Sequence, residues 1–206
     1  MTFKEFYLTE DKDLTDNYIV VYGGRFQPFT PNHYEVYKQL TDKFGKDKVF
    51  IATSDKVEQP SSPFNFEEKV EIITKLFDIP KEKIIETQVP YKPVEVFERF
   101  KGKDFAYITV IGRKDAERLT SGKYFVAYHD DKMMYPYNKH GYVYVADNKN
   151  VSHDGKVISG TYVRNGIRKA IDSAQRERIL ENIYGKKNED VFNMIINRIL
   201  KSITPE

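Results

Sequence analysis

A strand, a glycine turn and a helix start follow one another directly near the beginning of the chain, and this arrangement constrains the fold most. The apolar run at 19–22 (Ile-Val-Val-Tyr) is typical of a buried strand. Gly23 and Gly24 allow a sharp backbone turn and leave room for a ligand to approach. Thr30 is a good N-cap and Pro31 suits the first helical position, so we expect a helix to begin there.

Asn32 and His33 fall in the first turn of this predicted helix. A helix start exposes free backbone N–H groups at the positive end of the helix dipole. A histidine placed there is directed at an anion, and phosphate is the anion that we expect. The alternative is an ordinary capped helix that follows a Gly-Gly turn.

A second predicted helix start, at residues 158–164, follows the same logic. Ser159 can cap the helix, and Gly160 and Thr161 then expose backbone amides, with the Thr161 hydroxyl as a further donor. Arg164 lies about one turn further along and can reach the same anion with its planar, bidentate fork. A capped helix with a solvated arginine is the structural alternative.

Strands and helices alternate along most of the chain. Apolar patterns predict strands at 18–22, 48–53, 83–87 and 105–111, and helices at 31–44, 65–77 and 94–100. This alternation predicts an α/β fold with a Rossmann-like, doubly wound parallel sheet. In such sheets ligands bind beyond the carboxyl ends of the strands, so we place residues 23–29 and 112–115 in one pocket.

Two later segments have more than one interpretation. Tyr124–Tyr128 and Tyr142–Ala146 are predicted strands, and the loop between them carries histidines and aspartates. Their spacing fits no standard metal site, so a solvated hairpin loop is the expectation. Residues 188–203 are amphipathic, and their apolar side either packs against the domain or forms a subunit contact in a homo-oligomer.

Composition excludes several classes of protein. The 206 residues are enough for one α/β domain, so we expect a single domain over 1–206, with its core at 17–170 and C-terminal helices at 171–206. A net charge of +2 with mixed signs argues against a nucleic-acid binder, and the absence of cysteine excludes a thiolate metal site. No apolar run approaches the ~20 residues of a membrane span, and no signal-peptide pattern is present, so we expect a cytoplasmic protein.

Four segments resemble motifs of the HxGH nucleotidyltransferases, and more narrowly of the archaeal-type nicotinamide mononucleotide (NMN) adenylyltransferases and their Nudix-fused relatives. Residues 24–29 read Gly-Arg-Phe-Gln-Pro-Phe, and residues 30–33 fill the HxGH position. Residues 63–73 resemble the Pro-Phe-Thr/Ser-Phe-Glu-Glu-Arg segment of these enzymes, and residues 110–116 resemble their Gly-x-x-Lys-Asp segment. Residues 158–164 resemble their Ile-Ser-Ser/Ala-Thr-x-x-Arg motif. The Glu-rich Nudix motif is absent from the chain.

The resemblance implies transfer of the adenylyl group of ATP to NMN, giving NAD and pyrophosphate. It implies catalytic roles for His33, Arg164 and Thr30. It implies substrate-binding roles for a larger set: Gly23, Gly24, Arg25, Phe26, Gln27, Asn32, Phe66, Lys69, Gly112, Lys114, Asp115, Ser159, Gly160 and Thr161. Mg²⁺ is the expected cofactor, bound through the triphosphate oxygens and without a protein ligand.

Two of these residues depart from the family pattern. Asn32 stands where the family has glycine, and we expect its amide to donate to a phosphate oxygen. Lys69 stands where the family has arginine, and a lysine offers a point charge in place of a fork. The alternatives are a cytidylyltransferase or another nucleotidyltransferase with a different phosphorylated acceptor, a non-catalytic nucleotide-binding homologue, and a protein that kept only the fold.

Overall fold

The computed structural model describes residues 14–90, 94–112, 123–130, 133–147 and 150–201. Its centre is a six-stranded sheet in the order β3-β2-β1-β4-β6-β5, and each neighbouring pair in it is parallel. The strands are β1 (Tyr18–Gly23), β2 (Val49–Thr53), β3 (Ile84–Glu86), β4 (Ala106–Ile111), β5 (Phe125–Ala127) and β6 (Gly141–Val145). The predicted doubly wound parallel α/β sheet is confirmed.

The two central strands, β1 and β4, position the site. All six residues of β4 are buried, as expected for a strand covered on both faces of a parallel sheet. The chain builds outward from β1 through β2 to β3, and then returns to place β4 on the other side of β1. The strand order therefore reverses between β1 and β4, and ligands bind beyond the carboxyl ends of strands at such a point.

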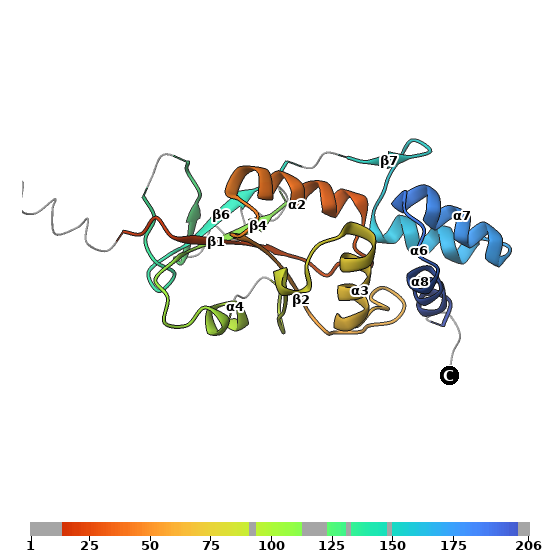
Figure 1. Ribbon diagram of the computed structural model, residues 1–206, viewed down its shortest axis with the longest axis horizontal. Helices are drawn as coiled ribbons and strands as arrows, with labels where there is room; N and C mark the ends of the chain where they lie inside the picture. The colour runs from red at the N-terminus through yellow and green to blue at the C-terminus, as the bar shows by residue number, and fades with distance from the viewer. Residues whose placement is uncertain (1–13, 91–93, 113–122, 131–132, 148–149, 202–206) are drawn as a thin grey trace, which may run out of the picture.

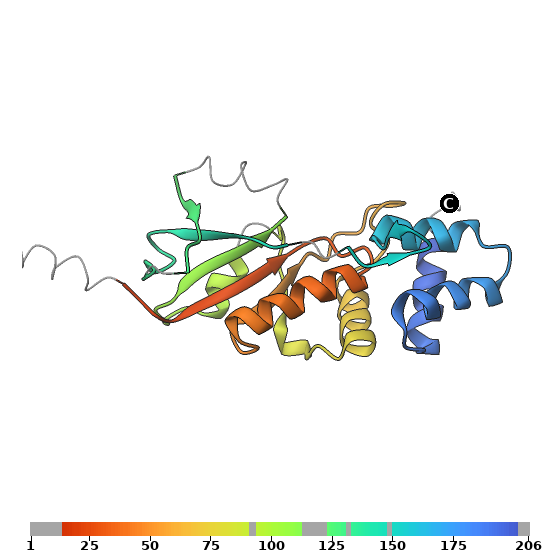
Figure 2. The same ribbon diagram turned by 90° about the horizontal axis from the view of Figure 1, so that it is seen from above.

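Helices cover both faces of the sheet and one of its ends. The helices are α2 (Pro31–Phe44), α3 (Phe66–Phe77), α4 (Val94–Arg99), α6 (Gly160–Lys169), α7 (Ser173–Tyr184) and α8 (Glu189–Lys201), with a 3-10 turn, η2, at Lys81–Lys83. α2 and α3 pack on one face of the sheet and α4 on the other. α6, α7 and α8 gather at the end of the molecule toward which β1 runs (Figures 1 and 2).

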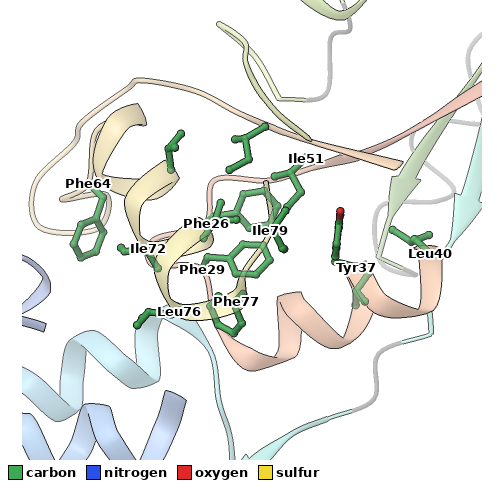
Figure 3. Packing of buried hydrophobic residues seen from close by; sticks show 14 of the residues in the cluster. Phe26, Phe29, Tyr37, Leu40, Ile51, Phe64, Ile72, Leu76, Phe77 and Ile79 are labelled. Carbon is green, nitrogen blue, oxygen red and sulfur yellow. The ribbon is translucent and has the colours of Figure 1, made fainter. Parts of the chain in front are cut away.

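The main core lies between the sheet, α2, α3 and the C-terminal helices. Phe26 and Phe29, from the loop after β1, point into it beside Phe77 of α3 (Figure 3). The Tyr184 hydroxyl of α7 donates to the Phe29 carbonyl over 3.0 Å. The apolar residues of α8 are buried in the same cluster, so packing within the chain accounts for the amphipathic pattern of this helix.

The prediction of a hairpin that joins the aromatic strands β5 and β6 is wrong. β5 and β6 pair in parallel, with Val126 opposite Tyr142, so the connection must return to the amino end of the sheet. Tyr137 holds this connection at the amino end of β4. Its ring stacks on Phe105, just before β4, at a centroid distance of 4.6 Å, and its N–H donates to the Phe105 carbonyl. Parallel strands need a long connection of this kind.

None of the helices in the described part of the chain has the length and apolar composition that a membrane crossing requires. The same residues contain no cluster of three histidine, aspartate or glutamate side chains arranged to hold a metal ion.

Replacement of Phe29 tests the importance of this core. Phe29 is fully buried against Phe26, Phe77 and His33, so Phe29→Ala should lower the free energy of unfolding by about 3–5 kcal/mol. Ile171→Ala, at a side chain that is 89% exposed, should change it by less than about 0.5 kcal/mol. Urea denaturation measures both, and equal effects would contradict the assignment of Phe29 to the core.

Candidate functional site

A cleft of about 390 Å³ lies at the carboxyl ends of β1 and β4. Many of the predicted site residues line it: Gly23, Gly24, Arg25, Phe26, Gln27, His33, Gly112, Ser159, Gly160, Thr161 and Arg164. The structure therefore brings together the two predicted helix starts, which are separated by more than 120 residues of chain. Lys114 and Asp115 lie outside the described residues.

His33 presents a neutral ring to this cleft. The Thr30 backbone N–H donates to His33 Nδ1 over 3.0 Å, so Nδ1 is the acceptor and the ring proton lies on Nε2. Phe26 and Phe29 flank the ring at centroid distances of 5.1 and 5.3 Å. This burial lowers the pKa of His33 to about 4, so the ring is uncharged at neutral pH. Its Nε2–H is a preorganised hydrogen-bond donor for a ligand.

Arg164 crosses from α6 to the loop after β1. Its Nη1 donates to the Gln27 carbonyl, and its Nη2 donates to Thr161 Oγ1 over 3.1 Å. Part of the guanidinium fork is thus used to join two walls of the cleft. Its Nε is buried and has no hydrogen-bond partner within the described parts of the chain.

Gln27 is the residue at which three segments meet. Its side-chain amide donates to the Phe64 carbonyl and accepts from the Phe64 N–H, both over 2.9 Å, so it pairs with that residue as a strand would. Its backbone carbonyl lies against the start of α6, where a Cβ added at Gly160 would come within 2.9 Å of the carbonyl carbon. Gly160 is therefore required by the close approach of these two backbones.

The cleft is strongly positive. Arg25 and Arg164 line it, and no carboxylate stands among the described lining residues. Burial lowers the pKa of Arg164, and the nearby positive charges of Arg168 and Arg25 lower it further. Two helix N-termini, α2 and α6, add their partial positive charge. This electrostatic environment favours a multiply charged anion.

Three predicted site residues lie behind the cleft. Thr30 is fully buried and acts on the site only through its contacts with His33. Phe66 is buried in the core at the start of α3. Lys69 is fully buried, and its Nζ donates to Thr53 Oγ1 over 3.2 Å and to the Ser54 carbonyl.

Lys69 therefore braces the turn after β2 and does not reach a ligand in the cleft. Burial lowers the pKa of Lys69 to about 8, an effect that the nearby carboxylates of Asp55 and Glu86 oppose. The structure corrects the expectation that this residue supplies a point charge for phosphate.

Asn32 is also placed differently from the expectation. Its Nδ2 donates to the Ile158 carbonyl over 2.6 Å, and its Oδ1 accepts from the Val151 N–H over 2.5 Å. Both ends of the amide are thus engaged by backbone, and Asn32 does not line the cleft. The expected contact with phosphate is replaced by a contact with the chain itself.

Several residues that line the cleft are not among those predicted from the sequence: Tyr22, Val36, Ser61, Ser62, Ile111 and Ala146. Ser61 and Ser62 lie in a tight turn closed by backbone hydrogen bonds between Glu58 and Ser62. The available signal was their position in the loop that follows β2, because that loop leaves the sheet at the same edge as the loops after β1 and β4.

The family is decided by a match over most of the chain. Residues 21–166 match the family model described as cytidylyltransferase-like. The chain belongs to the cytidylyltransferase-like family. The matched region of this nucleotidyltransferase family includes the starts of α2 and α6 and the strands between them. No curated protein sequence matches the chain.

Solved structures share the fold at low sequence identity. A bifunctional NMN adenylyltransferase/ADP ribose pyrophosphatase from Francisella tularensis, complexed with AMP and a Mn ion, is 14% identical with a TM-score of 0.53. That match covers 90% of this chain and 52% of the Francisella chain, so this chain spans about half of its length. A second structure of the enzyme has 16% identity and a TM-score of 0.54, covering 87% of this chain and 49% of that one.

The burial of neutral His33 predicts a pH-dependent stability. The folded-state pKa is about 4 against 6.5 for an unperturbed histidine, so between these values the unfolded chain binds a proton that the folded chain does not. The contribution is complete above pH 6.5 and is lost as the pH falls toward 4. His33→Gln keeps a side chain that can cap Thr30 but does not titrate. Between pH 7 and 5, wild type should lose about 2 kcal/mol more stability than this variant in urea denaturation. Equal losses would contradict the buried, neutral ring.

Two glycines of α6 give a matched pair of substitutions. A methyl group at Gly160 would overlap the Gln27 carbonyl, so Gly160→Ala should destabilise the protein by about 1–3 kcal/mol. At Gly166 the nearest atom is 3.4 Å away, so Gly166→Ala should be neutral or stabilise by up to about 1 kcal/mol. Thermal or urea unfolding compares the two. A harmless Gly160→Ala would show that α6 and the Gln27 loop are not in close contact.

Proposed function

We propose that this protein transfers the adenylyl group of ATP to NMN, giving NAD and pyrophosphate. The observation that carries nucleotidyl transfer is the convergence of two helix N-termini, one with neutral His33 and the other with Arg164, on a cleft without a described carboxylate. Support for ATP and NMN comes from the resemblance of residues 24–29 to NMN adenylyltransferases. The Francisella enzyme, whose fold the chain shares, carries the same activity in its name.

The reaction suits a site of this kind. A phosphate oxygen of the mononucleotide attacks the α-phosphorus of the triphosphate, and the bond from that phosphorus to the pyrophosphate oxygen breaks. The attacking oxygen is already a nucleophile at neutral pH, so no general base is required. Catalysis then consists of holding two polyanions in line and stabilising the charge that develops on the α-phosphate and the leaving group.

Each helix start has its own task in this proposal. The Nε2–H of His33, at the positive end of the α2 dipole, donates to the α-phosphate oxygens. The amides of Gly160 and Thr161, with Arg164, hold the β- and γ-phosphates that leave as pyrophosphate. Arg25, an exposed residue of the cleft lining, neutralises further charge of the polyphosphate. His33 acts as a neutral donor, since its pKa of about 4 leaves it uncharged at neutral pH.

Magnesium enters this proposal with the nucleotide. The described lining offers the hydroxyls of Ser61, Ser62, Ser159 and Thr161 but no carboxylate, so we assign the ion no ligand among these residues. Mg²⁺ bound to the triphosphate oxygens would neutralise charge on the leaving group. The chain's own residues fit such a complex as ligands of the phosphates.

A pyrophosphate-release assay tests the proposal. ATP, CTP, GTP and UTP are each supplied with Mg²⁺, with and without NMN, and the product of any active pair is identified by mass. We expect release with ATP only when NMN is present, and NAD as the product. A preference for CTP would move the assignment to a cytidylyltransferase with another acceptor. Nucleotide binding without release for any pair would make the protein a non-catalytic homologue.

His33 should be required for turnover rather than for folding. Removing one preorganised donor typically lowers kcat by about 10²-fold or more, and we expect that loss for His33→Ala with little change in KM. His129→Ala, at an exposed histidine after β5, is the control and should keep full activity. Steady-state kinetics measures both variants. Activity of His33→Ala within about threefold of wild type would remove His33 from the mechanism.

A further inference from the structure

The hairpin that precedes α6 is closed at its neck by a side chain from α2. β7 (Ser152–His153) and β8 (Lys156–Val157) form an antiparallel pair that stands beside α6 (Figure 1). At the next pair outward, the Ile158 N–H donates to the Val151 carbonyl over 2.9 Å. The second bond of that pair, from the Val151 N–H to the Ile158 carbonyl, is not made directly.

The amide of Asn32 takes the place of this second bond. Its Oδ1 accepts from the Val151 N–H over 2.5 Å, and its Nδ2 donates to the Ile158 carbonyl over 2.6 Å. A side-chain amide is the group that can accept and donate in one plane, as a peptide group does. Glycine at position 32 would leave both backbone groups without these partners, and partly buried backbone groups are costly to leave unpaired.

Both ends of this contact lie one or two residues from the lining of the cleft. Asn32 is followed by His33, whose ring lines the cleft at the start of α2. Ile158 is followed by Ser159, the N-cap of α6, and by Gly160, which lies against the Gln27 carbonyl. The Asn32 side chain therefore joins the starts of α2 and α6, next to His33 on one side and to Ser159 and Gly160 on the other.

We infer that Asn32 is a positioning residue that holds the start of α6 in register with the start of α2, so that a single polyphosphate chain contacts both. This inference rests on the proposed function for the identity of the nucleotide, but not for the presence of a polyphosphate site. Asn32 thus raises the affinity for the triphosphate indirectly, by holding the backbone of Val151 and Ile158 that leads into α6. It acts on the mononucleotide much less, because α6 holds the triphosphate.

Binding and exchange measurements on Asn32→Ala and Asn32→Gly test the inference. We expect about tenfold weaker binding of ATP and of inorganic tripolyphosphate by calorimetry, with the KM for NMN changed less than twofold. We also expect faster hydrogen exchange at the Val151 amide, because its acceptor is gone. Asn188→Ala is the matched control: it removes an asparagine that caps α8 over 3.1 Å, remote from the cleft, and should lower stability without weakening ATP binding.

The outcomes separate this inference from the proposed function. Unchanged ATP affinity in both Asn32 variants, with or without faster Val151 exchange, would overturn the positioning role. Equal weakening of ATP binding by Asn188→Ala would reduce the effect to general loss of stability and overturn it as well. Failure of the wild-type protein to bind either polyphosphate would overturn it too. Tight ATP binding without any reaction with NMN would remove only the proposed function.

Discussion

The arrangement of the cleft depends on the double hydrogen bond between the Gln27 side chain and the backbone of Phe64. This pair joins the loop after β1 to the loop after β2, across 37 residues of sequence, and both partners are buried. The carbonyl of the same Gln27 then receives Arg164 and packs against Gly160. Because one residue holds all three walls, the positions of the hydrogen-bond donors that line the cleft are coupled through it.

The electrostatics of the cleft follow from this geometry. Arg25 and Arg164 face a space lined by two helix N-termini, without a carboxylate in the lining that the structure describes. An arginine whose partners are backbone and hydroxyl groups keeps its charge available to a ligand. Together with a histidine held neutral by burial, this produces a site of fixed donors rather than of groups that gain and lose protons.

Asn32 and Lys69, which differ from the family pattern, both form hydrogen bonds to other parts of the chain. Lys69 donates to the turn after β2 from a fully buried position, and Thr53 Oγ1, which it contacts, donates in turn to the Arg25 carbonyl over 3.5 Å. Asn32 closes the neck of the β7–β8 hairpin. At both positions a polar side chain supports a loop that leads to residues of the cleft, so a departure in residue type is compatible with an intact cleft.

The sequence by itself determined the strand–turn–helix unit at β1 and α2, the second helix start at Ser159 and the parallel α/β class, because apolar periodicity, caps and glycine turns act between near neighbours. It also placed His33 in the first turn of one helix and Arg164 about one turn into the other. Only the tertiary structure decided that Gln27 binds Phe64, that Asn32 binds Val151 and Ile158, and that β5 runs parallel to β6. The partners in these contacts are distant in sequence, and a polar side chain bonds to whichever group the packed chain brings within reach.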